Sequence, residues 1–182
     1  MQFFSYAKIL VKNVKLLYIK NINIGVFMEI RIIKNNEFEE TCELMARASR
    51  QAFSPYYPEN EVERIIESLS VERMKKRAEW THFYVAKEDE KIIGCGAIGP
   101  YWGSETESSL FNIFVDPKHQ NKGVGKQIIQ TLEADEFARR AERIEIPASI
   151  PAIPFYKKMG YKFKNNEMLF KDGHFSLEKF MK

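Results

Sequence analysis

Residues 115–126 read Val-Asp-Pro-Lys-His-Gln-Asn-Lys-Gly-Val-Gly-Lys, and this stretch decides the fold of the 182-residue chain. The apolar run at 110–115 has the composition of a strand, and Asp-Pro ends it. Ile128, Ile129 and Leu132 then follow at helical spacing. The sequence therefore predicts a strand, a short loop with two glycines and the start of a helix. Unpaired amides and the positive end of the helix dipole suit such a turn to phosphate.

The spacing of the loop residues separates this turn from the common nucleotide-binding loops. The loop reads Gln120-x-x-Gly123-x-Gly125, and it contains neither Gly-x-Gly-x-x-Gly nor Gly-Lys-Ser/Thr. A turn that needs glycine only for its backbone angles is the structural alternative. A second pattern follows further along the chain and reads Ser149-x-x-Ala152-x-x-Phe155-Tyr156-x-x-x-Gly160-Tyr161.

Together the two patterns resemble those of the GNAT N-acetyltransferase superfamily, in which the first loop grips coenzyme A. The resemblance covers roughly residues 28–182. It implies direct transfer of the acetyl group of acetyl-CoA, in a ternary complex, to a primary amine of a small molecule, peptide or protein. A sensor or regulatory module that binds acyl-CoA without turnover is the alternative. The sequence does not name the acceptor.

Strand and helix signals alternate along the chain. We expect strands at 29–34, 81–87, 91–98, 108–115 and 143–147 and a final hairpin over 161–181. We expect helices at 36–51, at 59–79 with a possible break at 68–70, at 123–141 and at 151–159. Ser149 is a plausible N-cap, and Pro154 then requires a later helix start or a distorted first turn. The expected fold is α/β (α+β mixed): a mixed, mostly antiparallel, six- to seven-stranded sheet flanked by helices.

The resemblance also assigns an acetyl-CoA site. Backbone amides of the loop would wrap the pyrophosphate, and lysines at 122, 126, 157 and 158 could meet phosphate charge, although for any single one a solvated surface lysine is the favoured alternative. An N–H of Phe114 or Val115 would polarise the thioester carbonyl. The predicted cofactor-binding residues are Phe114, Val115, Gln120, Asn121, Lys122, Gly123, Val124, Gly125, Lys126, Ser149, Phe155 and Tyr156.

Two residues are candidates for catalysis. Tyr156 matches the tyrosine that protonates the departing thiolate in the family, and its alternative is a core aromatic of an amphipathic helix. Many relatives carry a glutamate as base at the position of Ser109, so this chain departs from the pattern. Glu107, or Glu105, could act instead through water, and the alternative is an exposed loop acid. Tyr56, Tyr57, Tyr101 and Trp102 are candidate walls of the acceptor site.

The first 27 residues differ from the rest of the chain. They hold four lysines and no acid, and without them the chain has 24 basic and 25 acidic residues. The domain at 28–182 is therefore not basic, and no nucleic-acid partner is expected. Lysines interrupt the apolar residues of 1–27 too often for a membrane span. We expect an N-terminal extension outside the domain, with a membrane-surface amphipathic segment as the alternative.

Cysteine and histidine add little to the functional reading. Cys42 and Cys95 have no pairing or metal spacing, which favours reduced core residues of a cytoplasmic protein. His82, at a strand start, is a weaker candidate base than Glu105 or Glu107. His119 and His174 have no metal-ligand neighbour at useful spacing, so no metal is expected. A homodimer is possible, since the loop aromatics could equally be dimer contacts.

Overall fold

A computed structural model describes residues 28–171 and 173–181; the expected extension at 1–27 lies outside them. One eight-stranded sheet forms its centre, in the order β1-β2-β3-β4-β5-β8-β6, with β7 paired to β8. The strands are β1 (Met28–Ile32), β2 (His82–Glu88), β3 (Lys91–Pro100), β4 (Glu107–Val115), β5 (Arg143–Ala148), β6 (Lys162–Phe163), β7 (Phe170–Lys171) and β8 (His174–Phe180). All of these pairings are antiparallel except β4 with β5. The predicted mixed, mostly antiparallel sheet is confirmed, but it has eight strands instead of the expected six to seven, because the region of the predicted final hairpin forms three strands, two of them only two residues long.

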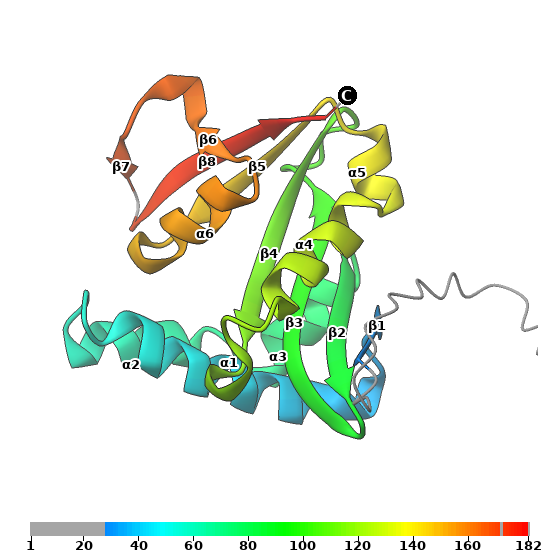
Figure 1. The fold of residues 1–182 in the computed structure, drawn as a ribbon, viewed down its shortest axis with the longest axis vertical. Helices are drawn as coiled ribbons and strands as arrows, with labels where there is room; N and C mark the ends of the chain where they lie inside the picture. The colour runs from blue at the N-terminus through cyan, green and yellow to red at the C-terminus, as the bar shows by residue number, and fades with distance from the viewer. Residues whose placement is uncertain (1–27, 172, 182) are drawn as a thin grey trace, which may run out of the picture.

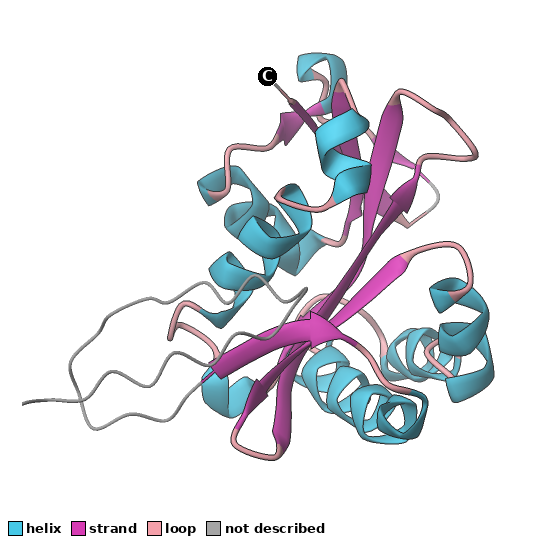
Figure 2. Ribbon diagram, turned by 90° about the vertical axis from the view of Figure 1, so that its right-hand side faces the viewer, coloured by secondary structure: helices cyan, strands magenta, loops and turns pink. Residues whose placement is uncertain are grey.

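Helices cover both faces of this sheet (Figure 1; Figure 2). They are α1 (Phe38–Phe53), α2 (Glu59–Glu67), α3 (Val71–Ala78), α4 (Val124–Glu133), α5 (Glu136–Arg140) and α6 (Ile153–Lys158). On one face, buried side chains of α1 and α3, such as Leu44 and Met74, pack on Phe83 and Val85 of β2. On the other, Ile128 and Leu132 of α4 pack over the sheet. None of the helices in the described ranges is long and apolar enough to cross a membrane.

Two glycines of β3 bring α4 close to the sheet. An added Cβ at Gly94 would stand 2.8 Å from Cδ1 of Ile128, and one at Gly96 would stand 2.8 Å from Cγ2 of the same residue. Real Cβ atoms do not approach so closely, so this spacing needs residues without side chains. Gly94 and Gly96 therefore help to set the position of α4, and with it the start of this helix beside β4.

The predicted continuous helix over 123–141 is wrong. The chain leaves the helix after Glu133, and Asp135 begins a new one by accepting a hydrogen bond from Phe137 N–H at 2.8 Å. The same carboxylate accepts bonds from Tyr84 Oη at 2.6 Å and pairs with Nδ1 of His82 at 2.8 Å. The helical spacing of apolar residues did not reveal this break, because two of the three bonds to the Asp135 carboxylate come from β2.

The other helices agree more closely with the pattern. The expected break at 68–70 is confirmed: α2 ends at Glu67, and Ser70 caps α3 by accepting from the Arg73 amide at 3.5 Å. A 3-10 turn, Ile150–Ala152, precedes α6, which begins at Ile153. This later start places Pro154 in the first turn, where a proline is tolerated. The Ser149 side chain makes no capping hydrogen bond.

Candidate active site between two diverging strands

The strands β4 and β5 meet at one end and separate at the other (Figure 1). Their parallel pairing covers only Glu107–Ser109 of β4, opposite Arg143–Glu145 of β5. Beyond Ser109 the edge of β4 that faces β5 has no strand partner within the described residues. Strand groups without a partner are available to a ligand. The sheet is therefore open from the middle of β4 to its C-terminal end.

Ion pairs hold the closed end together. Arg143 pairs with Glu107 at 3.0 Å, with Glu145 at 3.1 Å and with Glu178 of β8 at 2.8 Å, and Lys164 adds a bond to Glu145 at 2.8 Å. We call these five side chains the clamp. The surrounding carboxylates raise the pKa of Arg143, although burial opposes them. Because most of these groups are largely buried, they bind one another rather than water.

A β-bulge shapes the open end of β4. Cys95 of β3 pairs with Phe114 and Ala97 pairs with Phe111, so two residues of β4, one of them Asn112, stand opposite a single residue of β3. Asn112 has a positive φ of 52°, and its carbonyl accepts a bond from the Cys95 thiol at 3.3 Å. Bulges bend a strand and re-aim its groups. Here the bulge turns β4 where β5 has already separated from it.

A cavity of about 770 Å³ lies between β4 and β5 where the two strands have separated. Its wall comes from both faces of the sheet: Ala52 and Phe53 of α1 lie on one side, and Gly125 of α4 and Phe155 of α6 lie on the other. Three cations stand in the wall, namely Arg77, Lys126 and Lys158. No aspartate or glutamate of the described residues lines it. The cavity is thus open to both sheet faces and carries only positive charge.

The glycine loop stands at the rim of the cavity. Gly123 precedes the first residue of α4 and has a φ of +90°, a conformation that a side chain disfavours. A Cβ on Gly125 would lie 3.2 Å from two ring atoms of Phe155, so α6 packs where this residue has no side chain. Gln120 Nε2 donates to the Val115 carbonyl at 3.2 Å and closes the loop on β4. The loop presents backbone and a helix start to the cavity.

The structure brings most of the predicted acetyl-CoA residues together. Lys122 is exposed and does not line the cavity, and Val124 is buried beneath the loop in the core. Of the other lysines considered, Lys158 lines the wall, whereas Lys157 lies over the Phe163 ring at 4.4 Å. The predicted residues that do line it are Phe114, Val115, Gln120, Asn121, Gly123, Gly125, Lys126, Ser149, Phe155 and Tyr156.

Tyr156 differs from a neighbouring buried tyrosine. Both Tyr156 and Tyr161 are almost fully buried, and their ring centroids lie 6.0 Å apart. Tyr161 donates its hydroxyl proton to Glu133 at 2.9 Å. The Tyr156 hydroxyl has no hydrogen-bond partner within the described part of the chain, although the residue lines the cavity. Burial raises the pKa of Tyr156, so the phenol stays protonated.

The predicted acid near the site lies elsewhere. Both carboxylate oxygens of Glu107 accept hydrogen bonds from Arg143, at 3.0 and 3.1 Å, and the residue does not line the cavity. Its position at the paired start of β4 makes it part of the clamp. Sequence spacing placed this glutamate near the site but could not reveal its partner, which comes from β5.

None of the four loop aromatics considered as acceptor walls lines the cavity. Tyr57 Oη accepts from the Ile150 amide at 3.4 Å and joins the end of α1 to the turn before α6. Tyr101 Oη donates to Glu145 at 3.2 Å, while Tyr56 and Trp102 are exposed. The wall on this side is built instead by residues that the sequence did not single out: Ala48, Ala52, Phe53, Arg77 and Phe111.

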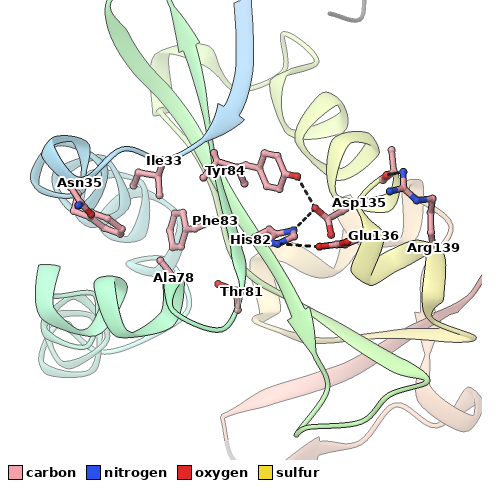
Figure 3. A pocket seen from close by; sticks show the side chains of 13 residues that line it. Ile33, Asn35, Ala78, Thr81, His82, Phe83, Tyr84, Asp135, Glu136 and Arg139 are labelled. Atoms are coloured by element: carbon pink, nitrogen blue, oxygen red, sulfur yellow. Dashed lines mark hydrogen bonds and ion pairs between the residues drawn. The ribbon is translucent and has the colours of Figure 1, made fainter. Parts of the chain in front are cut away.

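A second cavity, of about 710 Å³, lies beside β2 just past the end of β1 (Figure 3). Its polar side chains bind one another: Tyr84 and His82 both reach Asp135, and His82 Nε2 lies 3.5 Å from Glu136. These are the bonds that break the helix at Asp135. Within 28–171 and 173–181, no three His, Cys, Asp or Glu side chains converge in a way that could hold a metal ion.

Comparison with known proteins identifies the family. The model of the Acetyltransferase (GNAT) family matches residues 41–161. This chain belongs to the GNAT acetyltransferase family. The matched residues include α1 from residue 41 onward, the bulged β4, the glycine loop and Tyr156, so they contain the residues that line the cavity.

Curated relatives of this GNAT protein are distant. The uncharacterized N-acetyltransferase YafP of Escherichia coli K12 is 25% identical over 138 residues, which are 74% of this chain and 81% of YafP. The uncharacterized N-acetyltransferase MJ1207 of Methanocaldococcus jannaschii is 27% identical over 154 residues, but the match covers only 61% of that protein. Human N-acetyltransferase 8 is 30% identical over 88 residues, 44% of this chain and 38% of its own.

Solved structures share the fold. The PaiA N-acetyltransferase of Thermoplasma acidophilum, crystallised with coenzyme A, superposes with a TM-score of 0.73 at 19% identity, over 85% of this chain and 99% of its own. A GCN5-related N-acetyltransferase of Rhodopseudomonas palustris gives 0.70 at 17% identity, over 89% and 100%. At these identities the likeness concerns the fold alone. The absence of a nucleic-acid partner, the cytoplasmic location and the homodimer stay predictions.

Proposed function

We propose that this protein is an N-acetyltransferase that transfers the acetyl group of acetyl-CoA to a primary amine. The observation that carries the proposal is the cavity between β4 and β5, with the glycine loop at its rim and an unpaired buried phenol in its wall. Membership of the GNAT family supports acyl-CoA as the donor. In the reaction the amine nitrogen forms a bond to the acetyl carbon, the C–S bond breaks, and coenzyme A leaves as its thiol.

The donor would lie on the α4 side of the cavity. The free amides at the start of α4, together with Gly123 and Gly125, offer donors and close backbone approach to a pyrophosphate. Lys126 and Lys158 of the wall add positive charge. The PaiA protein, which shares this fold, was crystallised with coenzyme A, and this supports coenzyme A as a ligand of the fold.

The chemistry would take place where the bulge bends β4. An N–H of Phe114 or Val115 would donate to the thioester oxygen, which gains charge in the transition state. Tyr156 would donate its proton to the leaving thiolate. Since burial raises the pKa of this phenol, it is present in the donating form throughout the neutral range.

No described carboxylate lines the cavity to accept the proton that the amine must lose. Glu107 remains a candidate base only through water, because Arg143 already binds both of its oxygens. A cavity wall with three cations and no described acid disfavours an ammonium ion. We therefore propose that the acceptor loses one proton to water on entry and reacts as the neutral amine. When the C–N bond forms, the nitrogen gives up a second proton, through water, to the Tyr156 phenolate that protonation of the thiolate leaves behind.

A panel of primary amines tests the proposal through release of the free thiol from acetyl-CoA. Amine-dependent release above the rate of plain hydrolysis, with the acetylated amine found by mass spectrometry, is the expected result. Tight binding of acetyl-CoA with no acetylated product from any amine would favour the alternative, a sensor that binds acyl-CoA without turnover. The absence of a carboxylate from the wall is the observation that keeps this alternative open.

A further inference from the structure

Arg77 stands in the cavity wall, on the face of the sheet opposite the glycine loop. It lies in the last turn of α3, and it lines the cavity together with Ala52 and Phe53 of α1 and Phe111 of β4. The loop and α6 form the other side. If the donor occupies that other side, Arg77 belongs to the half of the cavity that an acceptor would fill.

The guanidinium of Arg77 is placed by aromatic rings rather than by acids. Its Cζ atom lies 4.6 Å from the centre of the Phe111 ring and 5.3 Å from that of Trp80, and these two rings meet edge to face at 5.2 Å. Such stacking fixes the plane of a guanidinium and leaves its N–H groups free. The side chain is therefore oriented without using its hydrogen-bond donors.

No carboxylate of the described residues neutralises this charge. The other partly buried arginines of the described chain, Arg31 and Arg143, each bind at least two glutamates. The Arg77 side chain makes no hydrogen bond or ion pair to any described residue. Burial lowers the pKa of Arg77, which marks the lack of a compensating anion, yet arginine stays charged at any ordinary pH. The N–H donors of this cavity-lining side chain thus have no acceptor among the described residues.

We infer that Arg77 binds a carboxylate of the acceptor, so that the substrate is a small amine that also carries a carboxylate. This inference rests on the proposed function. A planar guanidinium matches a carboxylate with two parallel hydrogen bonds. The neighbouring surface of Ala48, Ala52 and Phe53 is apolar and takes the hydrocarbon part of such a molecule. A polyamine, which has only cationic groups, finds no acid in this wall.

Matched amine pairs test the inference. Leucine and leucinamide, and β-alanine and β-alaninamide, differ in the carboxylate alone, and putrescine serves as the cationic acceptor. We expect the wild-type protein to prefer each carboxylate over its amide in kcat/KM. In Arg77→Gln this preference should fall about ten- to a hundred-fold, the range of a hydrogen bond to a charged group. The Kd of acetyl-CoA should not change.

A control separates this role from packing. Arg73→Gln removes the same charge one turn earlier on α3, from an exposed position that does not line the cavity, and should keep the wild-type preference. If Arg77→Gln lowers kcat/KM equally for acids, amides and putrescine, Arg77 only supports Phe111 and the inference is wrong. An equal rate for acids and amides in the wild-type protein would overturn it as well.

Calorimetry keeps the two proposals distinguishable. Leucine and β-alanine are titrated into the protein already loaded with coenzyme A, in wild type and in Arg77→Gln. If no amine is acetylated but the amino acids bind in an Arg77-dependent manner, the proposed function fails and the carboxylate site stands. If amines are acetylated but neither turnover nor binding depends on the carboxylate, the function stands and the carboxylate site fails.

Discussion

The two ends of the β4–β5 pair differ in how their charged side chains are paired. At the closed end, three residues on each strand pair, and the clamp joins two cations to three glutamates. At the open end, three cations line a cavity that contains no described acid, and a buried phenol lacks a partner. Charges at the closed end pair with one another, whereas the cations at the open end have no described counter-ion and are available to a ligand. Stability should therefore depend on the first region and turnover on the second.

The largest expected effect is on turnover, at the open end. Tyr156→Phe keeps the ring and removes the proton donor, so kcat should fall by about 10²–10⁴-fold while the Kd of acetyl-CoA stays constant. Tyr161→Phe is the matched control, since it removes a phenol that already binds Glu133. It should lower stability by about 1–3 kcal/mol and leave kcat unchanged. A wild-type kcat for Tyr156→Phe, measured where chemistry limits the rate, would make this residue a packing residue only.

The next effect is on stability, at the closed end. Arg143→Met leaves Glu107, Glu145 and Glu178 without their shared cation, and we expect the free energy of unfolding to fall by about 3–5 kcal/mol in urea denaturation. Arg64→Met, which breaks an exposed pair with Glu61, should change it by less than about 1 kcal/mol. A similar small loss in both variants would show that the clamp does not hold the strands.

The clamp also predicts a pH dependence. Burial opposes ionisation of Glu178, but the Asn165 amide and Arg143 outweigh it and hold its pKa below the usual range. A carboxyl with a lowered folded-state pKa stabilises the protein above its unfolded pKa of about 4.3, and this contribution is lost as the pH falls through the lower value. Acidification should therefore destabilise the wild-type protein, and Arg143→Met should show a shallower dependence.

The smallest effect concerns the Asp135 network, which belongs to neither end (Figure 3). Asp135→Ala removes the cap of α5 and the partner of Tyr84 and His82, so stability should fall by about 1–3 kcal/mol. Glu136→Ala, at an exposed neighbouring position, should stay within about 0.5 kcal/mol. Neither should alter the Kd of acetyl-CoA; a weakened affinity in Asp135→Ala would show that this network positions α4 for the site.

The features that the sequence predicted correctly are formed by residues close to one another in the chain. The strand, the glycine loop and the helix start lie within one short stretch, so residue order alone predicted that Gly123, Gly125 and Val115 belong together. The clamp and the break at Asp135 escaped prediction because their partners lie far away in the chain. Glu107 binds a residue 36 positions later, and Asp135 binds Tyr84 51 positions earlier.

Arg77 and the bulge left no signal in the sequence either. The arginine stands among other charged residues of an amphipathic helix, and only the fold brings it to the cavity. At Asn112 the bulge adds one residue to β4 relative to β3, and this extra residue is visible only in the register of the two paired strands. The motif thus predicted the glycine-loop side of the cavity, whereas the side formed by α1 and α3 required the tertiary structure.

Calorimetry of acetyl-CoA binding tests the central claim, that the loop at the open end holds the cofactor. Gly123 and Gly103 both have positive φ and free space around an added Cβ, so Glu at either position brings similar strain and the same charge. Gly123→Glu places a carboxylate where the pyrophosphate would lie and should abolish binding. Gly103→Glu, away from the cavity, should bind as the wild type does. Equal affinity in the two folded variants would contradict the account.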